Sequence, residues 1–157
     1  MKEKNKRSAP VDSGIFSTQL DSLLARIIDA GDRYLACGRG WYKVLAELEE
    51  RISIADPNCK LYRIGELDGR LLIEVADVSL IGSQAVRAAV TAAERRAGRT
   101  CEFSGEHGIL MQRNGMFRVL NPATAPEGYQ VVIKKELCVE GKHLLAIIEN
   151  LVQCKIK

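Results

Sequence analysis

Residues 64–75, IGELDGRLLIEV, give the clearest indication of the fold class. Two runs rich in strand-forming residues flank Asp68-Gly69. Because glycine takes positive φ freely, an Asp-Gly pair in this position predicts a two-residue hairpin turn. We therefore expect a two-stranded antiparallel hairpin within residues 59–77. A second hairpin is predicted at 108–120, where Asn114-Gly115 joins GILMQR to MFRVL, and a short strand is predicted at 99–103 (RTCEF).

The segments around the first hairpin have the helical period of three to four residues. A first helix is predicted to start at Ser17 or Thr18 and to end at Gly31, with one apolar face made of Leu20, Leu23, Leu24, Ile27 and Ile28. A second helix is closed by Pro57, with an apolar face made of Trp41, Val44, Leu45, Leu48 and Ile52 and a largely exposed face carrying Glu47, Glu49 and Glu50. A third helix starts at Ser79 or Ser83 and stops at Gly98, with an apolar face made of Val86, Ala89, Val90 and Ala93. The C-terminal segment is ambiguous: residues 130–139 favour a strand and residues 143–154 have helical period.

These patterns predict an α+β fold in which three to four amphipathic helices pack on short antiparallel β-hairpins. We expect residues 1–14 to form a flexible tail and residues 15–157 a single domain, with 122–157 as a C-terminal extension. The chain has no apolar run of the ~18 residues that a membrane span needs, and its N-terminus lacks a secretory signal. Five scattered cysteines without a C-x-x-C pair indicate reduced thiols, so a cytoplasmic location is expected.

Three segments taken together resemble a group of small, largely uncharacterised phage and bacterial proteins. Gly40-Trp41-Tyr42 with Leu45 and Leu48 is similar to their GW-x-x-L-x-x-L helix. The hairpin at 64–75 looks like their I-K-E-K-F-G-x-L-R hairpin, and residues 92–110 (AAERRAGRTCEFSGEHGIL) look like their helix end and C-x-x-C-G-x-x-G knuckle. The resemblance covers about residues 38–121 and implies a zinc-ribbon-like segment at 99–121.

The departures from that pattern concern the metal ligands. Cys101 keeps the first ligand position, but Ser104 stands at the second, and Asn121 and Thr124 stand at the later pair. Neutral hydroxyl and amide side chains are poor zinc ligands beside thiolate and imidazole. The segment is therefore predicted to be degenerate, with no metal and no cofactor. The alternative is a rebuilt site made of Cys101, His107, Cys138 and His143.

The charge distribution suggests where partners could bind. Residues 40–80 carry five bases and eight acids, and residues 81–120 carry six bases and three acids. Faces of opposite charge would suit a macromolecular partner, although solvated surface charge is the commoner explanation. The predicted partner-binding residues are Glu66, Asp68, Glu74, Asp77, Arg95 and Arg96. Strand alternation suggests that Glu66 and Glu74 share one side of the hairpin.

No nucleophile stands beside a base and an orienting carboxylate, so the chain is predicted not to be an enzyme. The function predicted is a non-catalytic, protein-binding inhibitor, most specifically an immunity protein that neutralises a bacterial toxin in the cytosol. The alternative is a phage or prophage accessory protein that binds nucleic acid through the basic region 87–118. Phe103 and Phe117 are interpreted as core residues in that region, which weakens the alternative because nucleic-acid binders usually expose aromatics beside their bases.

Overall fold

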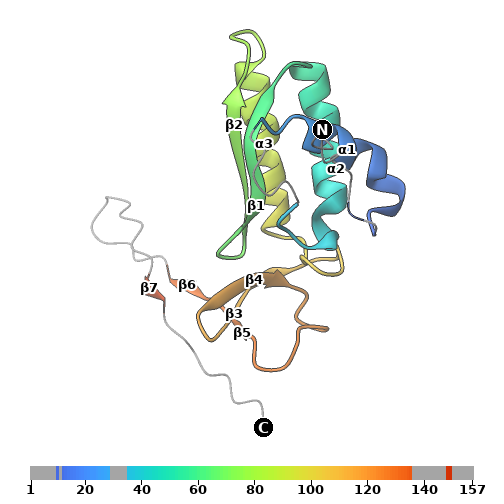
Figure 1. Ribbon diagram of the computed structural model, residues 1–157. Helices are drawn as coiled ribbons and strands as arrows, with labels where there is room; N and C mark the ends of the chain where they lie inside the picture. Colours follow the sequence, from blue (N-terminus) through green and yellow to red (C-terminus); the bar gives the residue numbers. More distant parts are fainter. Residues whose placement is uncertain (1–9, 11, 29–34, 136–147, 150–157) are drawn as a thin grey trace, which may run out of the picture.

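The computed structural model describes residues 10, 12–28, 35–135 and 148–149 of the chain (Figure 1). The fold is α+β, as predicted. In chain order the elements, with η for a short 3₁₀ turn, are η1 (Gly14–Phe16), α1 (Ser17–Ala25), η2 (Arg39–Trp41), α2 (Tyr42–Ala55), β1 (Lys60–Leu67), β2 (Arg70–Asp77), α3 (Ser83–Ala97), β3 (Ile109–Arg113), β4 (Met116–Leu120), β5 (Gln130–Val131), β6 (Lys134–Lys135) and β7 (Ile148–Glu149).

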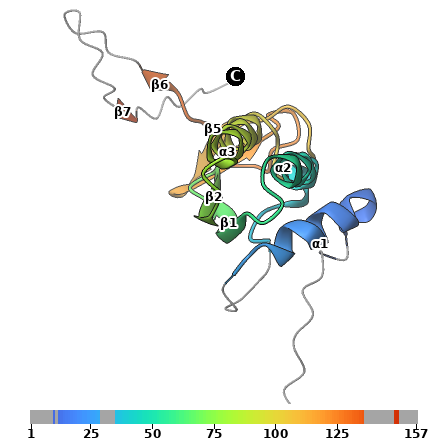
Figure 2. The ribbon, with the colours of Figure 1, turned by 90° about the horizontal axis from the view of Figure 1, so that it is seen from above.

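The predicted hairpin is formed by β1 and β2. Asp68 and Gly69 both have positive φ, +49° and +73°, as a type I′ turn requires. Ile64 pairs with Ile73 in the ladder, and both side chains are buried. β2 of the hairpin packs on α3, while α2 contacts both α3 and α1 (Figure 2).

The first helix is shorter than predicted. It ends at Ala25, and Ile27 forms a parallel bridge with Leu61 of β1. The backbone N–H of Ile28 donates to the Leu61 carbonyl, 3.0 Å away. The chain therefore leaves the helix to pair with the hairpin, and Ile28 is exposed instead of extending the apolar face.

The main core lies between the helices and the hairpin. Trp41 is completely buried, and its indole N–H donates to the carbonyl of Thr100, 2.8 Å away. The apolar faces predicted for the second and third helices are both buried. One prediction for the second helix is wrong: Glu49 is only 4% exposed, because Arg26 reaches it from α1.

The second predicted hairpin, β3 with β4, forms a small sheet in the order β4-β3-β5. Asn114 and Gly115 have the positive φ expected of its turn. The strand predicted at 99–103 is wrong, because residues 102–104 form turns. The chain turns there around Gly40: the N–H of Gly40 donates to the carbonyl of Glu102, and that of Gly105 to the carbonyl of Cys101. This close approach leaves no room for a Cβ on Gly40.

Parts of two predicted segments lie outside the described residues. Of the predicted tail, residues 1–9 and 11 are outside, whereas Ser13 is buried and Asp12 accepts a hydrogen bond from the Tyr42 hydroxyl. Most of the C-terminal extension beyond residue 135 is outside, and Ile148–Glu149 form a short strand paired with Lys134–Lys135. Among the described residues, no helix has the length and apolarity needed to cross a bilayer.

Candidate binding surface

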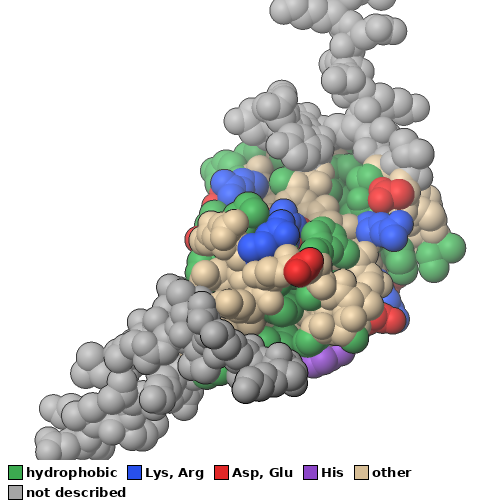
Figure 3. Space-filling model, turned by 90° about the horizontal axis from the view of Figure 1, so that it is seen from below, with side chains coloured by type: hydrophobic (Ala, Val, Ile, Leu, Met, Phe, Trp, Pro, Cys, Tyr) green, Lys and Arg blue, Asp and Glu red, His purple; other side chains and the backbone are tan. Residues whose placement is uncertain are grey.

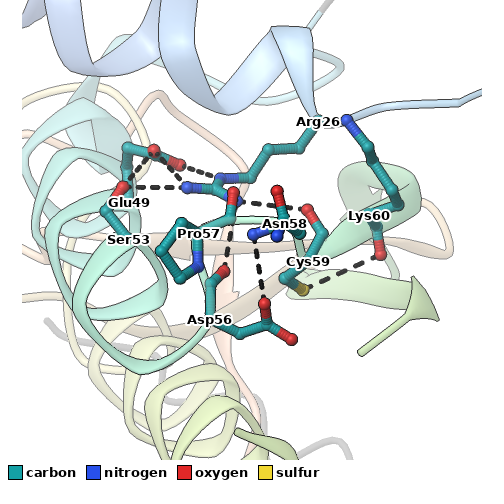
Figure 4. A network of polar contacts seen from close by, with 8 residues as sticks. All are labelled: Arg26, Glu49, Ser53, Asp56, Pro57, Asn58, Cys59 and Lys60. Carbon is teal, nitrogen blue, oxygen red and sulfur yellow. Dashed lines mark hydrogen bonds and ion pairs between the residues drawn. The ribbon is translucent and has the colours of Figure 1, made fainter. Parts of the chain in front are cut away.

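A buried polar network joins α1 to the end of α2 (Figure 4). The guanidinium of Arg26 forms a bidentate ion pair with Glu49, with Nε–Oε2 and Nη2–Oε1 distances of 2.7 and 2.9 Å. Its remaining N–H groups donate to the Ser53 hydroxyl and to the carbonyls of Pro57 and Cys59. The hydrogen bonds that Arg26 donates to Glu49 raise the pKa of the guanidinium. A buried pair of this kind fixes geometry because each polar group has a partner.

The hydrogen bonds of Arg26 restrain the segment that follows α2. Asp56 in turn restrains the turn between β2 and α3. The backbone N–H of Ser79 donates to one oxygen of its carboxylate, 2.6 Å away, and that of Asn58 to the other, 3.1 Å away. These bonds, with the one from Ser79 the largest influence, lower the pKa of Asp56. Gly82 lies against the backbone of Ala55. The turn between β2 and α3 is thereby tied to the end of α2.

This anchored end of the molecule exposes three large aliphatic side chains. Ile54, near the end of α2, is 86% exposed, and Leu80 and Ile81 in the tied turn are 94% and 97% exposed. We call these three residues the aliphatic end surface. Single exposed aliphatic residues are common, but adjacent large ones on a restrained turn are typical of contact surfaces.

The acidic residues predicted to bind a partner do not form a cluster. Glu66 and Glu74 lie on opposite faces of the hairpin, contrary to the prediction, because the two-residue turn pairs Glu66 with the buried Leu71 and Glu74 with Arg63. Glu66 accepts a hydrogen bond from the N–H of Gly69 and so supports the turn.

The other two acidic residues lie at the ends of the hairpin. Asp68 occupies the turn itself. Asp77 is opposite Lys60 in the ladder. Glu74 and Asp77 of β2 thus each lie opposite a basic residue of β1, but neither forms an ion pair among the described residues.

The basic residues are also partly engaged. Arg96 forms an ion pair with Glu47 across α3 and α2, whereas Arg95 is exposed with no ion pair among the described residues. Arg118 pairs with the buried Glu102 and lies over the ring of Phe103, which is 45% exposed rather than part of the core as predicted. Phe117 is only half-buried. Figure 3 shows acidic and basic side chains mixed on the face seen from below.

Four positions of the predicted degenerate knuckle correspond to zinc ligands in the proteins that it resembles. Three of them, Cys101, Ser104 and Asn121, lie together in the structure. The Cys101 sulfur is a hydrogen-bond acceptor for the Ser104 hydroxyl and for the backbone N–H groups of Ser104, Phe103 and Asn121. Burial raises the pKa of this thiol, but these hydrogen bonds outweigh burial and lower the pKa. Thr124 follows in the next turn, where its N–H donates to the carbonyl of Asn121. The sulfur is thus held within its own loop, and Cys101 is buried.

Metal binding and thiol chemistry receive no other support from the described part of the chain. There, no group of three or more His, Cys, Asp or Glu side chains could hold a metal ion. The rebuilt site was predicted to use Cys138 and His143, which lie outside the described residues. Burial raises the pKa of the Cys37 thiol to about 12.

No family model, curated protein or solved structure matches the chain. The resemblance to phage and bacterial proteins therefore stays a prediction.

Sequence reasoning missed the aliphatic end surface. Leu80-Ile81 lies in the segment Asp77-Val78-Ser79-Leu80-Ile81-Gly82-Ser83, and an apolar pair between helix-capping residues was available as a signal. The two residues fall just before the helix that starts at Ser83, so they belong to neither the strand nor the helical period. An apolar pair outside both patterns indicates exposure rather than core.

Proposed function

We propose that this protein is a non-catalytic binding protein that recognises another protein through the aliphatic end surface. The observation that carries the proposal is the near-complete exposure of Leu80 and Ile81 on a turn that Asp56 ties to the molecule. Burying a large aliphatic side chain contributes about 1.5–3 kcal/mol, and a restrained turn loses little conformational entropy on binding.

The specific form that we propose is a cytoplasmic inhibitor of the immunity type, which neutralises a bacterial toxin by binding it. Binding alone is sufficient for this role. A small protein that displays a rigid apolar surface with a charged surround has the features of a protein-binding interface. Exposed Arg51 stands three residues before Ile54 on α2, and exposed Arg87 lies in the second turn of α3.

Co-purification with the products of neighbouring genes tests the proposal. We expect a 1:1 complex with one of them, and loss of that complex with the double variant Leu80→Asp/Ile81→Asp. Ile15→Asp is the matched control, because Ile15 is also highly exposed but lies in η1. Failure of every neighbouring product to bind, or equal binding by the double variant, would contradict the proposal.

A second candidate function is nucleic-acid binding through the basic region 87–118. The observation that favours it is a pair of arginine–aromatic contacts on the small sheet: Arg118 over Phe103, and Arg113 over Tyr129 with its guanidinium carbon 4.7 Å from the ring centre. Such groups can stack on bases of a single strand. Fluorescence anisotropy with a labelled single-stranded DNA or RNA at low salt tests it, and binding should weaken steeply as salt rises. Absence of binding at low salt would remove this candidate.

A further inference from the structure

The outer strand of the main hairpin, β2, presents an edge that no other described strand pairs with. β2 is bonded only to β1 within the part of the chain that the structure describes. Figure 1 shows β1 on one side of β2 and no described strand along its other side. β2 is eight residues long and lacks proline. One register irregularity falls at Tyr62 of β1 and the other at Ala76 near the end of β2, so the pairing is regular from Arg70 to Glu74. Edges of this kind are templates for a further strand unless a protein blocks them.

The turn fixes which backbone groups are free. In a two-residue hairpin the flanking residues, Leu67 and Arg70, form a hydrogen-bonded pair, and bonding alternates from there. Arg70, Leu72 and Glu74 therefore direct their N–H and C=O groups to β1. Leu71 and Ile73 direct theirs outward. The free edge thus offers pairs of donors and acceptors centred on Leu72.

The charges along β2 favour pairing with a second copy of β2 in one register. Arg70, Leu72 and Glu74 share the face opposite the buried Leu71 and Ile73. When two copies of β2 pair about a twofold axis, one residue must lie opposite itself. With Leu72 at that position, Arg70 of each copy lies opposite Glu74 of the other. Both residues are exposed and have no ion pair among the described residues.

Neighbouring registers lack this complementarity. An axis at Glu74 sets that carboxylate opposite its own copy, and like charges in this position are unfavourable. An axis at Leu71 sets Asp68 opposite Glu74 of the second copy. An axis at Ile73 sets Glu74 opposite Leu72. Only the axis at Leu72 gives two opposite-charge pairs around a central apolar pair.

A cavity of about 700 Å³ lies at the same edge. Its walls include Gly69, Leu71 and Leu72 of the hairpin, with Leu110 and Val132 of the small sheet. In the register centred on Leu72, Val75 of the second copy falls beside Gly69, one of the residues that line this cavity. The apolar side chains that line the cavity can pack against the end of the incoming strand.

We infer that two copies of this chain associate through antiparallel pairing of their β2 edges, with Leu72 on the twofold axis. The product is a four-stranded sheet in the order β1-β2-β2-β1. The inference rests on β2 and the cavity and is independent of the aliphatic end surface.

Charge reversal tests the register. Sedimentation equilibrium of the full chain, with reductant present, should show a monomer–dimer equilibrium. Arg70→Glu and Glu74→Arg should each weaken dimerisation about tenfold or more, since two attractive pairs become repulsive. An equimolar mixture of these two variants should dimerise again, because positions 70 and 74 of opposite copies then always join one acidic and one basic side chain. Arg51→Glu makes the same charge change at an exposed position of α2 and should leave dimerisation unchanged.

Cross-linking tests the axis. Residues at a non-hydrogen-bonded antiparallel pair have Cα atoms about 4.5 Å apart, which a disulfide can bridge. Under mild oxidation Leu72→Cys should give a disulfide-linked dimer. Glu74→Cys should not, because four residues, about 13 Å along the strand, separate the two copies of residue 74. The native cysteines are common to both variants.

Three results would overturn the inference. The first is a monomer at every concentration up to about 1 mM. The second is a dimer that neither charge reversal weakens, or a dimer that the mixture of the two variants fails to restore. The third is equal cross-linking at residues 72 and 74. Circular dichroism of each variant establishes that the hairpin remains folded.

Discussion

At the residue scale, Arg26 holds the largest concentration of buried polar contacts in the described part of the chain. Replacing it with Met leaves the Glu49 carboxylate buried without its partner, and breaking a buried pair in this way costs about 3–5 kcal/mol. We expect Arg26→Met to lower the free energy of unfolding by that amount in urea denaturation. The double variant Arg26→Met/Glu49→Leu should be more stable than the single variant, because the isolated charge is gone. A double variant no more stable than Arg26→Met would show that the carbonyl contacts of Arg26, not the pair, dominate.

Asp56 gives a prediction of pH dependence. Its pKa is lowered in the folded chain, so its carboxylate contributes stability above the unfolded pKa of about 4. That contribution is lost as the pH falls through the folded pKa. We expect Asp56→Asn to destabilise the protein at pH 7 and to have a much smaller effect near pH 3. Urea denaturation of both proteins at the two pH values measures this, and an effect of equal size at both would contradict the assignment.

At the scale of elements, the junction of η2 with the 101–105 turns depends on Gly40. A Cβ there would lie against the carbonyl of Cys101 and within 2.6 Å of the Gly105 nitrogen. Because both contacts are backbone, they cannot move aside as a side chain can. We expect Gly40→Ala to lower the free energy of unfolding by about 1–3 kcal/mol or more.

Gly98, which follows α3, is the control for that substitution. It has φ −62°, and the nearest atom to an added Cβ is 3.5 Å away. Gly98→Ala should therefore be neutral or stabilise the protein by about 0.4–1 kcal/mol, because it restricts the unfolded chain. Equal destabilisation by both substitutions in urea denaturation would show that the contact at Gly40 is not responsible.

Some features of the fold could be predicted from the sequence and others could not. The difference depends on whether the residues that determine the feature are close together or far apart along the chain. Asp68-Gly69 and Asn114-Gly115 encode their turns locally, so both hairpins were predictable. The burial of Glu49 depends on Arg26, 23 residues away, and no local period records such a partner. The end of α1 likewise depends on pairing with Leu61. The Leu80-Ile81 pair had a local signal in the sequence, but the restraint on its turn depends on the bond between Ser79 and Asp56, 23 residues apart.

At the scale of the molecule, the helical core and the small sheet meet at Glu102. One oxygen of its buried carboxylate accepts from the N–H of Gly38, 3.1 Å away, and the other from Arg118, 2.8 Å away. The carbonyl of the same residue accepts from Gly40, and Trp41 donates to Thr100. Val119 of β4 belongs to the main core. The small sheet therefore cannot detach without exposing a charge and part of the core.

This coupling predicts that the two parts unfold together. Trp41 is the chain's only tryptophan and lies at the junction, so its fluorescence reports the junction, while far-ultraviolet circular dichroism reports mainly the helices. The two denaturation curves should coincide, as two-state unfolding requires. Glu102→Leu leaves Arg118 and the N–H of Gly38 without their acceptor. In this variant we expect the midpoint of the fluorescence curve to lie at a lower denaturant concentration than the midpoint of the dichroism curve. Separate midpoints in the wild-type chain would mean that Glu102 does not couple the small sheet to the core.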